Sequence, residues 1–267
     1  MGFKKNLVKN KNQFYGFITN LKVVKFCIIV SVISWIGGLG IGYLVAQFDP
    51  AGPGSDPAGY SLFVNYISDL GSLNYTPIPK FLDDGLMLTG ILLIPVAFYL
   101  KKILGSPSES KILRKLLSTL VLICNLIGAC GIFLTGVISE DVGERLDAIF
   151  GTPLPDYPSH DLAADIAFYN FLMMGFFLGL LLIMYPDILR ERIGIKHSKI
   201  IRLLLTIDML IISPILFVIF WESYPDIYIF GFFSSFWEWM LVISYSAWQI
   251  PISLMLLKPL NRELASK

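Results

Sequence analysis

The feature that most constrains this chain is a series of six long apolar stretches, each about the length of a membrane-spanning helix. A hydrocarbon core about 30 Å thick is crossed by roughly 20 residues in helical form. The stretches cover residues 24–46, 81–100, 116–138, 162–185, 203–221 and 229–257, approximately. Only 15% of the residues are charged, against about 25% in soluble domains. The sequence therefore predicts an all-α polytopic membrane bundle of six transmembrane helices.

Lysine and arginine are sorted along the chain. They gather at the N-terminus, in the second and fourth loops with the adjoining helix ends, and at the C-terminus, and only Lys80 and Arg145 lie elsewhere. Basic segments of multi-pass proteins stay on the cytoplasmic side. We therefore expect both termini to be cytoplasmic. The expected organisation is a basic segment over residues 1–23, a transmembrane domain over 24–257 and a tail over 258–267.

Composition and motifs exclude several classes of protein. A net charge of +1 provides no basic face for nucleic acid, so no nucleic-acid partner is expected. The three cysteines lie in apolar runs, which does not fit a disulfide framework. The familiar nucleotide, hydrolase and zinc-protease motifs are missing, and no organic cofactor is indicated. With only two histidines, any metal would be a divalent cation held by carboxylates, such as calcium, magnesium or manganese.

Polar side chains from several helices reach one common depth. Counting about 20 residues from the cytoplasmic end of each helix places them near the outer surface. Ionisable groups at such positions normally face the protein interior or a watery cavity. We therefore expect an outward-facing acidic pocket that binds a cation, a proton or a lipid headgroup. Its candidate residues are Ser68, Asp69, Asp83, Asp84, Ser139, His160, Asp161, Asp165 and Glu238.

Spacing within the helices supports this pocket. Asp161 and Asp165 are four residues apart, so they share one face of the fourth helix. In the sixth stretch, Glu238 lies in a stripe with Tyr245 and Gln249, while the other faces are aromatic or aliphatic. Glu238 cannot cap a helix that starts near Ile229, so it is the strongest single candidate. The neighbouring tryptophans of this stretch are expected to form an interfacial belt.

Simpler structural roles exist for the other candidates. Asp83 or Asp84 could cap the second helix. Asp161 could be the first-turn acid of the fourth helix, and acids such as Glu144 and Asp147 could form a solvated rim. The glycines of the third helix, including Gly131 and Gly136, are expected to allow close helix packing.

Asp208 is a separate candidate on the cytoplasmic side. It lies about five residues, or roughly 8 Å, inside the fifth stretch. An unpaired carboxylate is costly at that depth. We expect it to pair with a snorkelling lysine such as Lys25 or Lys115, with a cytoplasmic gate as the alternative role.

The segment Tyr66-Ile67-Ser68-Asp69-Leu70-Gly71, together with His160 and Trp248, resembles a family of uncharacterised six-helix prokaryotic membrane proteins. The layout is also similar to DRAM and Sfk-type membrane proteins, which are associated with lipid homeostasis and autophagy. The pair Asp83-Asp84 departs from the family pattern, which has an amide in the second helix. The resemblance implies the architecture and a link to membrane lipids.

Two classes of function remain open at this stage. The first is a non-enzymatic protein, related to lipids or transport, that binds a lipid headgroup, a cation or a proton in the outer pocket. The alternative is a membrane hydrolase acting on a lipid, in which a carboxylate such as Asp69, Asp165 or Glu238 and His160 act as acid, base or ligand. The sequence contains no recognisable pair of nucleophile and base, which favours the first class.

Overall fold

The computed structural model describes residues 16–48, 60–105, 112–154, 157–195, 198–224 and 228–266. Most of the basic N-terminal segment and the first part of the first loop lie outside these ranges. Within them, six helical spans are long and apolar enough to cross a membrane. The predicted six-helix, all-α architecture is therefore confirmed.

Four of the six spans are single helices: α2 (Leu21–Phe48), α3 (Lys80–Leu104), α4 (Ile112–Val137) and α6 (Ser159–Met184). The fifth span joins α7 (Ser198–Ile207), the π-helical η3 (Asp208–Ile212) and α8 (Ser213–Ser223). The sixth joins α9 (Ser234–Met255) and α10 (Leu257–Ala265). The short elements between spans are η1 (Ser68–Gly71), α5 (Glu140–Phe150) and η2 (Ile188–Ile193).

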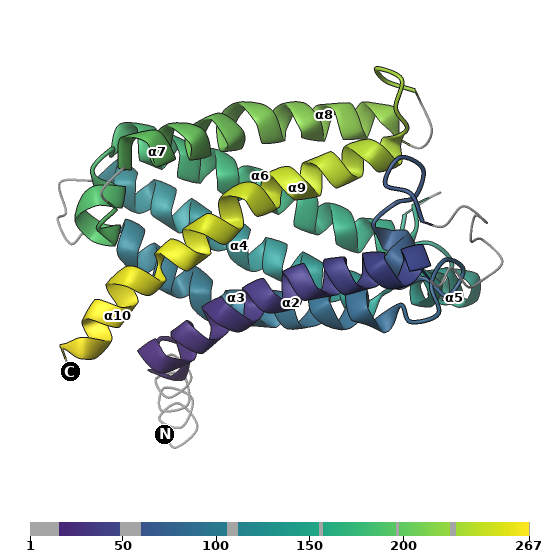
Figure 1. Ribbon diagram of the computed structural model, residues 1–267, viewed down its shortest axis with the longest axis horizontal. Helices are drawn as coiled ribbons and strands as arrows, with labels where there is room; N and C mark the ends of the chain where they lie inside the picture. The colour runs from purple at the N-terminus through teal and green to yellow at the C-terminus, as the bar shows by residue number, and fades with distance from the viewer. Residues whose placement is uncertain are drawn as a thin grey trace, which may run out of the picture.

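The spans pack in chain order and then double back. Helices α2, α3, α4 and α6 each pack against the next, and α8 packs against α9. Figure 1 shows α9 running diagonally across the bundle toward α2. The start of α2 and the end of α10 lie at one end, while α5 lies at the opposite end, which we call the distal end. Six spans therefore bring the two ends of the described chain to one side of the bundle.

Glycines set the close approach of the central helices. A Cβ atom at Gly131 would lie 2.5 Å from the backbone nitrogen of Ala167 on α6. A Cβ atom at Gly136 would lie 2.5 Å from the carbonyl oxygen of Asp83 on α3. Small residues allow helix backbones to approach this closely, so the predicted role of these two glycines is confirmed.

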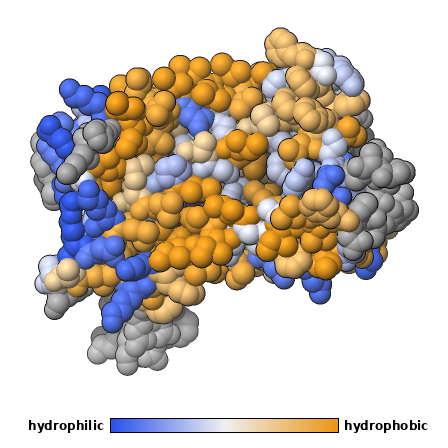
Figure 2. All heavy atoms as spheres, viewed as in Figure 1, coloured by the Kyte–Doolittle hydropathy of each residue, from blue (hydrophilic) through white to orange (hydrophobic). Residues whose placement is uncertain are grey.

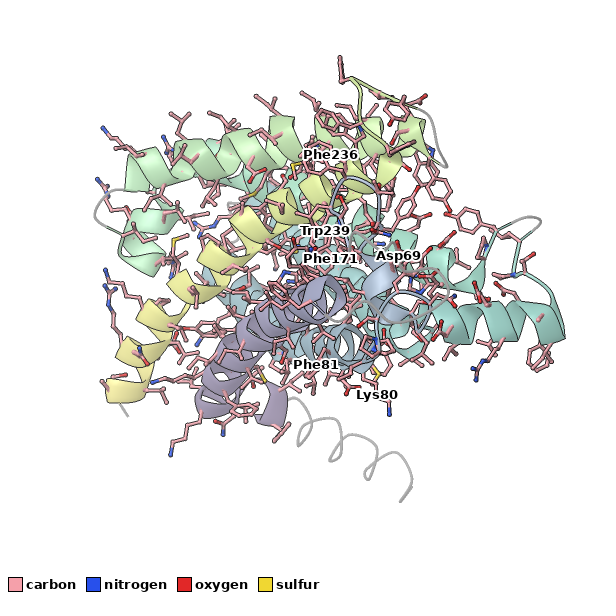
Figure 3. The ribbon with its side chains drawn as sticks, turned by 45° about the vertical axis from the view of Figure 1, so that its right-hand side comes forward. Asp69, Lys80, Phe81, Phe171, Phe236 and Trp239 are labelled. Atoms are coloured by element: carbon pink, nitrogen blue, oxygen red, sulfur yellow. The ribbon has the colours of Figure 1, made fainter. Side chains whose placement is uncertain are left out.

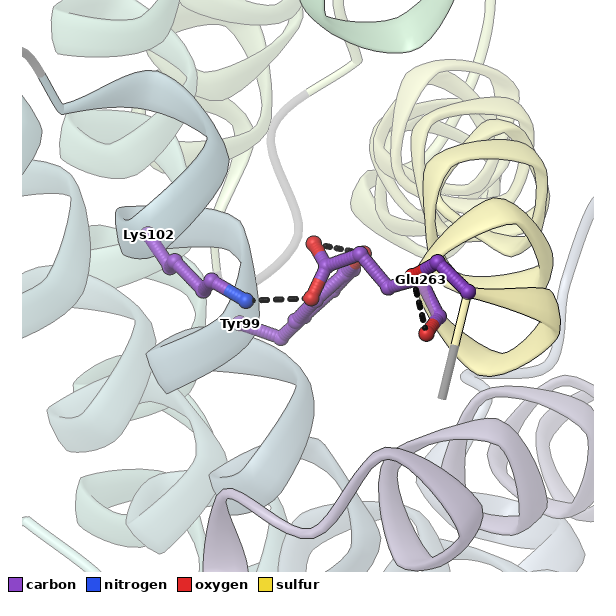
Figure 4. Close-up of polar contacts among 4 residues, drawn as sticks. Tyr99, Lys102 and Glu263 are labelled. Atoms are coloured by element: carbon purple, nitrogen blue, oxygen red, sulfur yellow. Dashed lines mark hydrogen bonds and ion pairs between the residues drawn. The ribbon is translucent and has the colours of Figure 1, made fainter.

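The surface divides into an apolar middle and a hydrophilic end. Large apolar side chains such as Phe26 and Ile33 are 59% and 62% exposed, and hydrophobic residues cover most of the face in Figure 2. Hydrophilic residues gather at the end where α10 lies. There Lys102 forms an ion pair with Glu263, and Tyr99 donates a hydrogen bond to the same carboxylate at 3.3 Å (Figure 4). These contacts fasten α10 to α3.

One predicted helix start and one predicted loop at the distal end are wrong. The sixth helix begins at Ser234 rather than near Ile229, because Phe230 and Gly231 take positive φ angles of 52° and 81° and close a tight turn between Ile229 and Phe232. Such angles interrupt a helix and favour glycine. The second outer loop also contains a helix, α5, which was not expected.

Candidate functional site

The first loop folds over the distal end and is fastened to the first two turns of α9. The indole nitrogen of Trp239 donates hydrogen bonds to the hydroxyl of Tyr60 and the carbonyl of Asn65, both at 3.2 Å. The hydroxyl of Ser235 donates to the carbonyl of Phe63 at 3.3 Å. Trp239 is buried, so it holds the loop and does not belong to the interfacial belt that we expected.

Helix α5 holds the far side of the same loop. The carboxylate of Asp141 accepts hydrogen bonds from the hydroxyl of Ser72 at 2.7 Å and the backbone N–H of Leu73 at 3.0 Å. A charged acceptor strengthens such bonds. The loop is therefore fixed between α9 and α5, and it positions η1 between them.

Asp69 of η1 is largely buried. Its Oδ2 accepts hydrogen bonds from the backbone N–H of Tyr66 at 2.9 Å and from the side chain of Asn65 at 3.3 Å. Burial raises the pKa of Asp69 to about 6, although these two hydrogen bonds act in the opposite direction. Figure 3 shows Asp69 at the distal end, where η1 meets the helix bundle.

A cavity of about 690 Å³, lined by many acidic side chains, opens beside this loop. We call it the acidic vestibule. Its described lining contains aromatic rings, one histidine and no lysine or arginine. The volume falls in the usual range for small-molecule sites, about 300–1000 Å³. Its carboxylates come from η1, α5, α6 and α9, and they are Asp69, Glu140, Glu144, Asp147, Asp161, Asp165 and Glu238.

A second cavity runs from the vestibule into the bundle. This apolar cleft has a volume of about 100 Å³ and is lined by α2, α3, α4, α6 and α9. Leu86, Ile132 and Phe171 are among its side chains, and Figure 3 places Phe171 well inside the bundle. In the C-terminal half of α9 the lining includes Ser246 and Gln249. The indole of Trp35 on α2 donates to Ser246 at 2.9 Å, which closes the cleft between α2 and α9.

The vestibule and the cleft meet at five residues. Ser68, His160, Ala164, Phe168 and Glu238 line both cavities. They come from the first loop, α6 and α9, which are distant in sequence. The site therefore has a polar chamber and an apolar chamber with a common boundary.

Glu238 is held at this boundary by the first loop. Glu238 is only 7% exposed, and its Oε2 accepts a hydrogen bond from the backbone N–H of Ile67 at 2.7 Å. The other oxygen, Oε1, has no hydrogen-bond partner among the described residues. Since the residue lines both cavities, one carboxylate oxygen fixes the loop and the other is free for the cavity.

His160 has a similar arrangement on α6. It is 8% exposed, and its Nδ1 lies 2.6 Å from the carbonyl oxygen of Ile138. A carbonyl only accepts hydrogen bonds, so Nδ1 carries a proton, and Nε2 of the neutral ring is an acceptor. No described residue is a partner of Nε2. Gly143 of α5 packs against His160, because a Cβ atom at Gly143 would lie 3.0 Å from the Cβ atom of His160.

Acids from α5 and α6 complete the vestibule. Burial raises the pKa of Glu140 to about 8, and the negative charges of Asp69, Glu144, Asp141 and Asp161 raise it further in the same direction. Tyr224, which follows α8, donates a hydrogen bond to Asp161 at 2.8 Å. At neutral pH, the vestibule therefore favours a proton or another positive charge.

The structure brings six of the nine candidate residues into the vestibule: Ser68, Asp69, His160, Asp161, Asp165 and Glu238. Asp83 lines the apolar cleft, whereas Asp84 and Ser139 line neither cavity.

Asp83 and Asp161 lie in the first turns of α3 and α6, as considered above, but neither helix is capped by a side-chain hydrogen bond. The N-cap residue of α3 is Pro79. At the start of α6, the backbone N–H and the hydroxyl of Ser159 both donate to Asp147 of α5. Asp161, the first-turn acid of α6, also accepts a hydrogen bond from Tyr224.

Asp208 has hydroxyl partners in place of the basic partner that we expected. Its Oδ1 accepts hydrogen bonds from Ser213 at 3.3 Å and from Ser244 of α9. The ion pairs among the described residues do not include Asp208. The helix begins at Ser198, so Asp208 lies about ten residues, or roughly 15 Å, from its end, deeper than the sequence suggested.

Sequence reasoning missed the contribution of α5 to the site. Glu140, Glu144 and Asp147 all line the vestibule. They are spaced at i, i+4 and i+7, which places them on one face of a helix. This periodicity was a usable signal, but the segment reads as a loop because it lies outside the six long apolar stretches.

Comparison with protein-family models, curated proteins and solved structures finds no match for the chain. The resemblance to an uncharacterised six-helix family therefore stays a prediction, and the geometry of the two cavities carries the functional argument.

Proposed function

We propose that this multi-pass protein binds an amphiphilic membrane molecule, with the polar group in the acidic vestibule and the apolar part in the cleft. The observation that carries the proposal is the common boundary of the two cavities at Ser68, His160 and Glu238. A membrane lipid has the same two-part chemistry, so one molecule can fill both chambers without burying a polar group in an apolar site.

The dimensions favour a slender ligand. The vestibule, at about 690 Å³, accommodates a headgroup with its water, whereas the cleft, at about 100 Å³, is narrow. One hydrocarbon chain fits such a cleft better than two.

A second candidate, hydrolysis of a bound lipid, is favoured by the state of His160. The hydrogen bond from Nδ1 to Ile138 fixes the tautomer in which Nε2 is a base. Ser68 lines the same boundary and could supply a hydroxyl nucleophile or orient a water molecule. Product formation from a bound lipid would distinguish this candidate from binding alone.

The proposal is tested by filling the boundary with a larger side chain. Ala164 lines both cavities, so Ala164→Leu should displace the ligand. Ala265→Leu adds the same atoms at an exposed position of α10 and is the matched control. Protein purified in mild detergent is extracted and analysed by mass spectrometry for amphiphiles bound in stoichiometric amounts.

We expect a bound amphiphile in the wild type and in Ala265→Leu, and its loss in Ala164→Leu. Equal lipid content in all three proteins, or no specific amphiphile in any of them, would contradict the proposal. The same samples, incubated with the extracted lipid, show whether it is cleaved.

A further inference from the structure

We propose that the amphiphile carries a protonated primary amine, which donates hydrogen bonds to Oε1 of Glu238 and Nε2 of His160. This inference rests on the proposed function and specifies the class of its ligand. It is carried by the two unused acceptor atoms at the boundary and by the sign of the charge around them.

The two acceptors are a matched pair. Glu238 and His160 are both more than nine-tenths buried. Each uses one polar atom to bind backbone, through Ile67 and Ile138, and each leaves the other polar atom without a partner among the described residues. Neither atom is among the fully enclosed polar atoms that lack a partner, so both are accessible from the cavities that the two residues line. Both residues line the boundary of the two cavities, where a ligand group with several N–H donors would meet acceptors on α6 and α9.

The fixed backbone contacts also make the pair rigid. The hydrogen bond from Ile67 orients the Glu238 carboxylate, and the bond to Ile138 orients the His160 ring. Groups positioned before binding lose little entropy when the ligand arrives. The geometry therefore suits recognition of one donor group rather than general attraction of positive charge.

The charge of the vestibule selects among lipid headgroups. Its described lining has seven carboxylates and neither lysine nor arginine. A phosphate or carboxylate headgroup would be repelled and would find no cationic partner. An ammonium group finds carboxylates and the faces of aromatic rings, among them Tyr66, Trp221 and Tyr224, which attract cations.

A metal ion is the competing occupant of an acidic cavity. Within the described residues, no group of three or more histidine, cysteine or acidic side chains has the geometry to hold one. An apolar cleft joins the vestibule at Glu238. A bare ion would leave this cleft unfilled, whereas the hydrocarbon chain of an amine would occupy it.

The experiment compares four single-chain probes of equal chain length in phosphatidylcholine nanodiscs. They are a primary amine, a trimethylammonium amphiphile, an alcohol and a fatty acid. Each competes with a photo-crosslinkable long-chain amine for the full-length protein, and concentrations are expressed as mole fractions of the membrane lipid. The trimethylammonium probe keeps the charge and lacks N–H donors, and the alcohol keeps a donor and lacks the charge.

The amine should compete best in the wild type. The trimethylammonium probe should reach the same competition only at about tenfold higher mole fraction, because it lacks the charge-assisted hydrogen bonds. The fatty acid should not compete. In Glu238→Gln, the amine probe should need about tenfold more to compete than in the wild type, which brings its competing concentration close to that of the alcohol probe. Glu222→Gln, an exposed acid on α8 outside both cavities, is the matched control and should behave as the wild type.

The possible failures are distinct. Equal competition by the fatty acid and the amine, or by the trimethylammonium probe and the amine, would overturn the amine inference and leave the proposed function standing. Displacement of the amine by calcium or manganese alone at low concentration would also overturn it. No saturable crosslinking by any amphiphile would overturn the proposed function itself. If Glu238→Gln does not fold, the ranking of the four probes on the wild type decides the question.

Discussion

The contact between α4 and α6 gives a sharp test of the fold that positions the site. A methyl group added at Gly131 would lie 2.5 Å from the nitrogen and 2.8 Å from the Cα atom of Ala167. Ordinary van der Waals contact begins near 3.4 Å, so α4 and α6 would have to separate by about 1 Å. The clashing atoms belong to the backbone, so no side-chain rotation relieves the contact.

The expected cost follows from two opposing terms. Alanine is about 1 kcal/mol more favourable than glycine within a helix, and overpacking a close contact costs about 1–3 kcal/mol. Gly40 on α2 is exposed and has no atom within 4 Å of an added Cβ atom. Both substitutions share the gain in helix propensity, so the stability difference between Gly131→Ala and Gly40→Ala isolates the packing cost of about 1–3 kcal/mol.

The free energy of unfolding of both variants is measured in detergent micelles by circular dichroism against increasing denaturant. We expect Gly40→Ala to be as stable as the wild type or more stable, and Gly131→Ala to fall below Gly40→Ala by the packing cost. Equal stability of the two variants would refute the reasoning, because it would mean that α4 and α6 are not in backbone contact at Gly131.

Three further predictions concern orientation, pH and the first loop. In a cysteine-free background, Ser266→Cys and Thr152→Cys should be labelled from opposite sides of the membrane, with Ser266→Cys cytoplasmic, and labelling of both from outside would contradict this. Burial raises the pKa of Asp69 to about 6 and of Glu140 to about 8, so the folded state binds more protons than the unfolded state. Thermal stability should therefore be highest below about pH 4, where both groups are protonated in the folded and the unfolded state, and fall as the pH rises from there through the folded-state values of about 6 and about 8. Glu140→Gln should flatten the upper part of this profile, and a profile that rises with pH would contradict the prediction. Asp141→Ala should cost about 1–3 kcal/mol, mainly by leaving the hydroxyl of the buried Ser72 unpaired, and should expose the first loop to limited proteolysis, whereas unchanged resistance would show that this anchor is dispensable.

The helical architecture could be predicted from the sequence because membrane spans are set by length and apolar composition. The ends of the spans could not. Residues 229–233 are as apolar as the helix that follows, and only the positive φ angles of Phe230 and Gly231 separate them from it. Helix α5 escaped notice for the opposite reason, because it is charged and short while its faces are still sorted as in any amphipathic helix.

The depth of several candidate residues along the helices could be predicted from the sequence, whereas their contacts could not. Counting residues from the basic helix ends placed Glu238 and Asp165 near one depth, and both line the vestibule. Asp84 and Ser139, placed at the same depth, line neither cavity. The partner of Glu238 is the backbone of Ile67, which lies 171 positions away in the chain. A backbone N–H leaves no mark in a sequence pattern, so the role of Glu238 in fixing the loop could only come from the structure.

Asp208 shows why depth alone does not identify a partner. Its cost in an apolar span was the correct premise, but the inference to a lysine assumed that the carboxylate lies near the end of the helix. Helix α7 begins several residues earlier, which moves Asp208 toward the middle of the span. Hydroxyl donors are available at that depth on two neighbouring faces, Ser213 after η3 and Ser244 on α9. Their oxygens lie 2.7 Å apart, so with Ser244 donating to Asp208 the single proton of Ser213 is shared between Asp208 and Ser244. Hydroxyl groups carry little desolvation penalty compared with an ammonium group. The packing of the fifth span against α9 therefore supplies hydrogen-bond donors to the Asp208 carboxylate without a buried lysine.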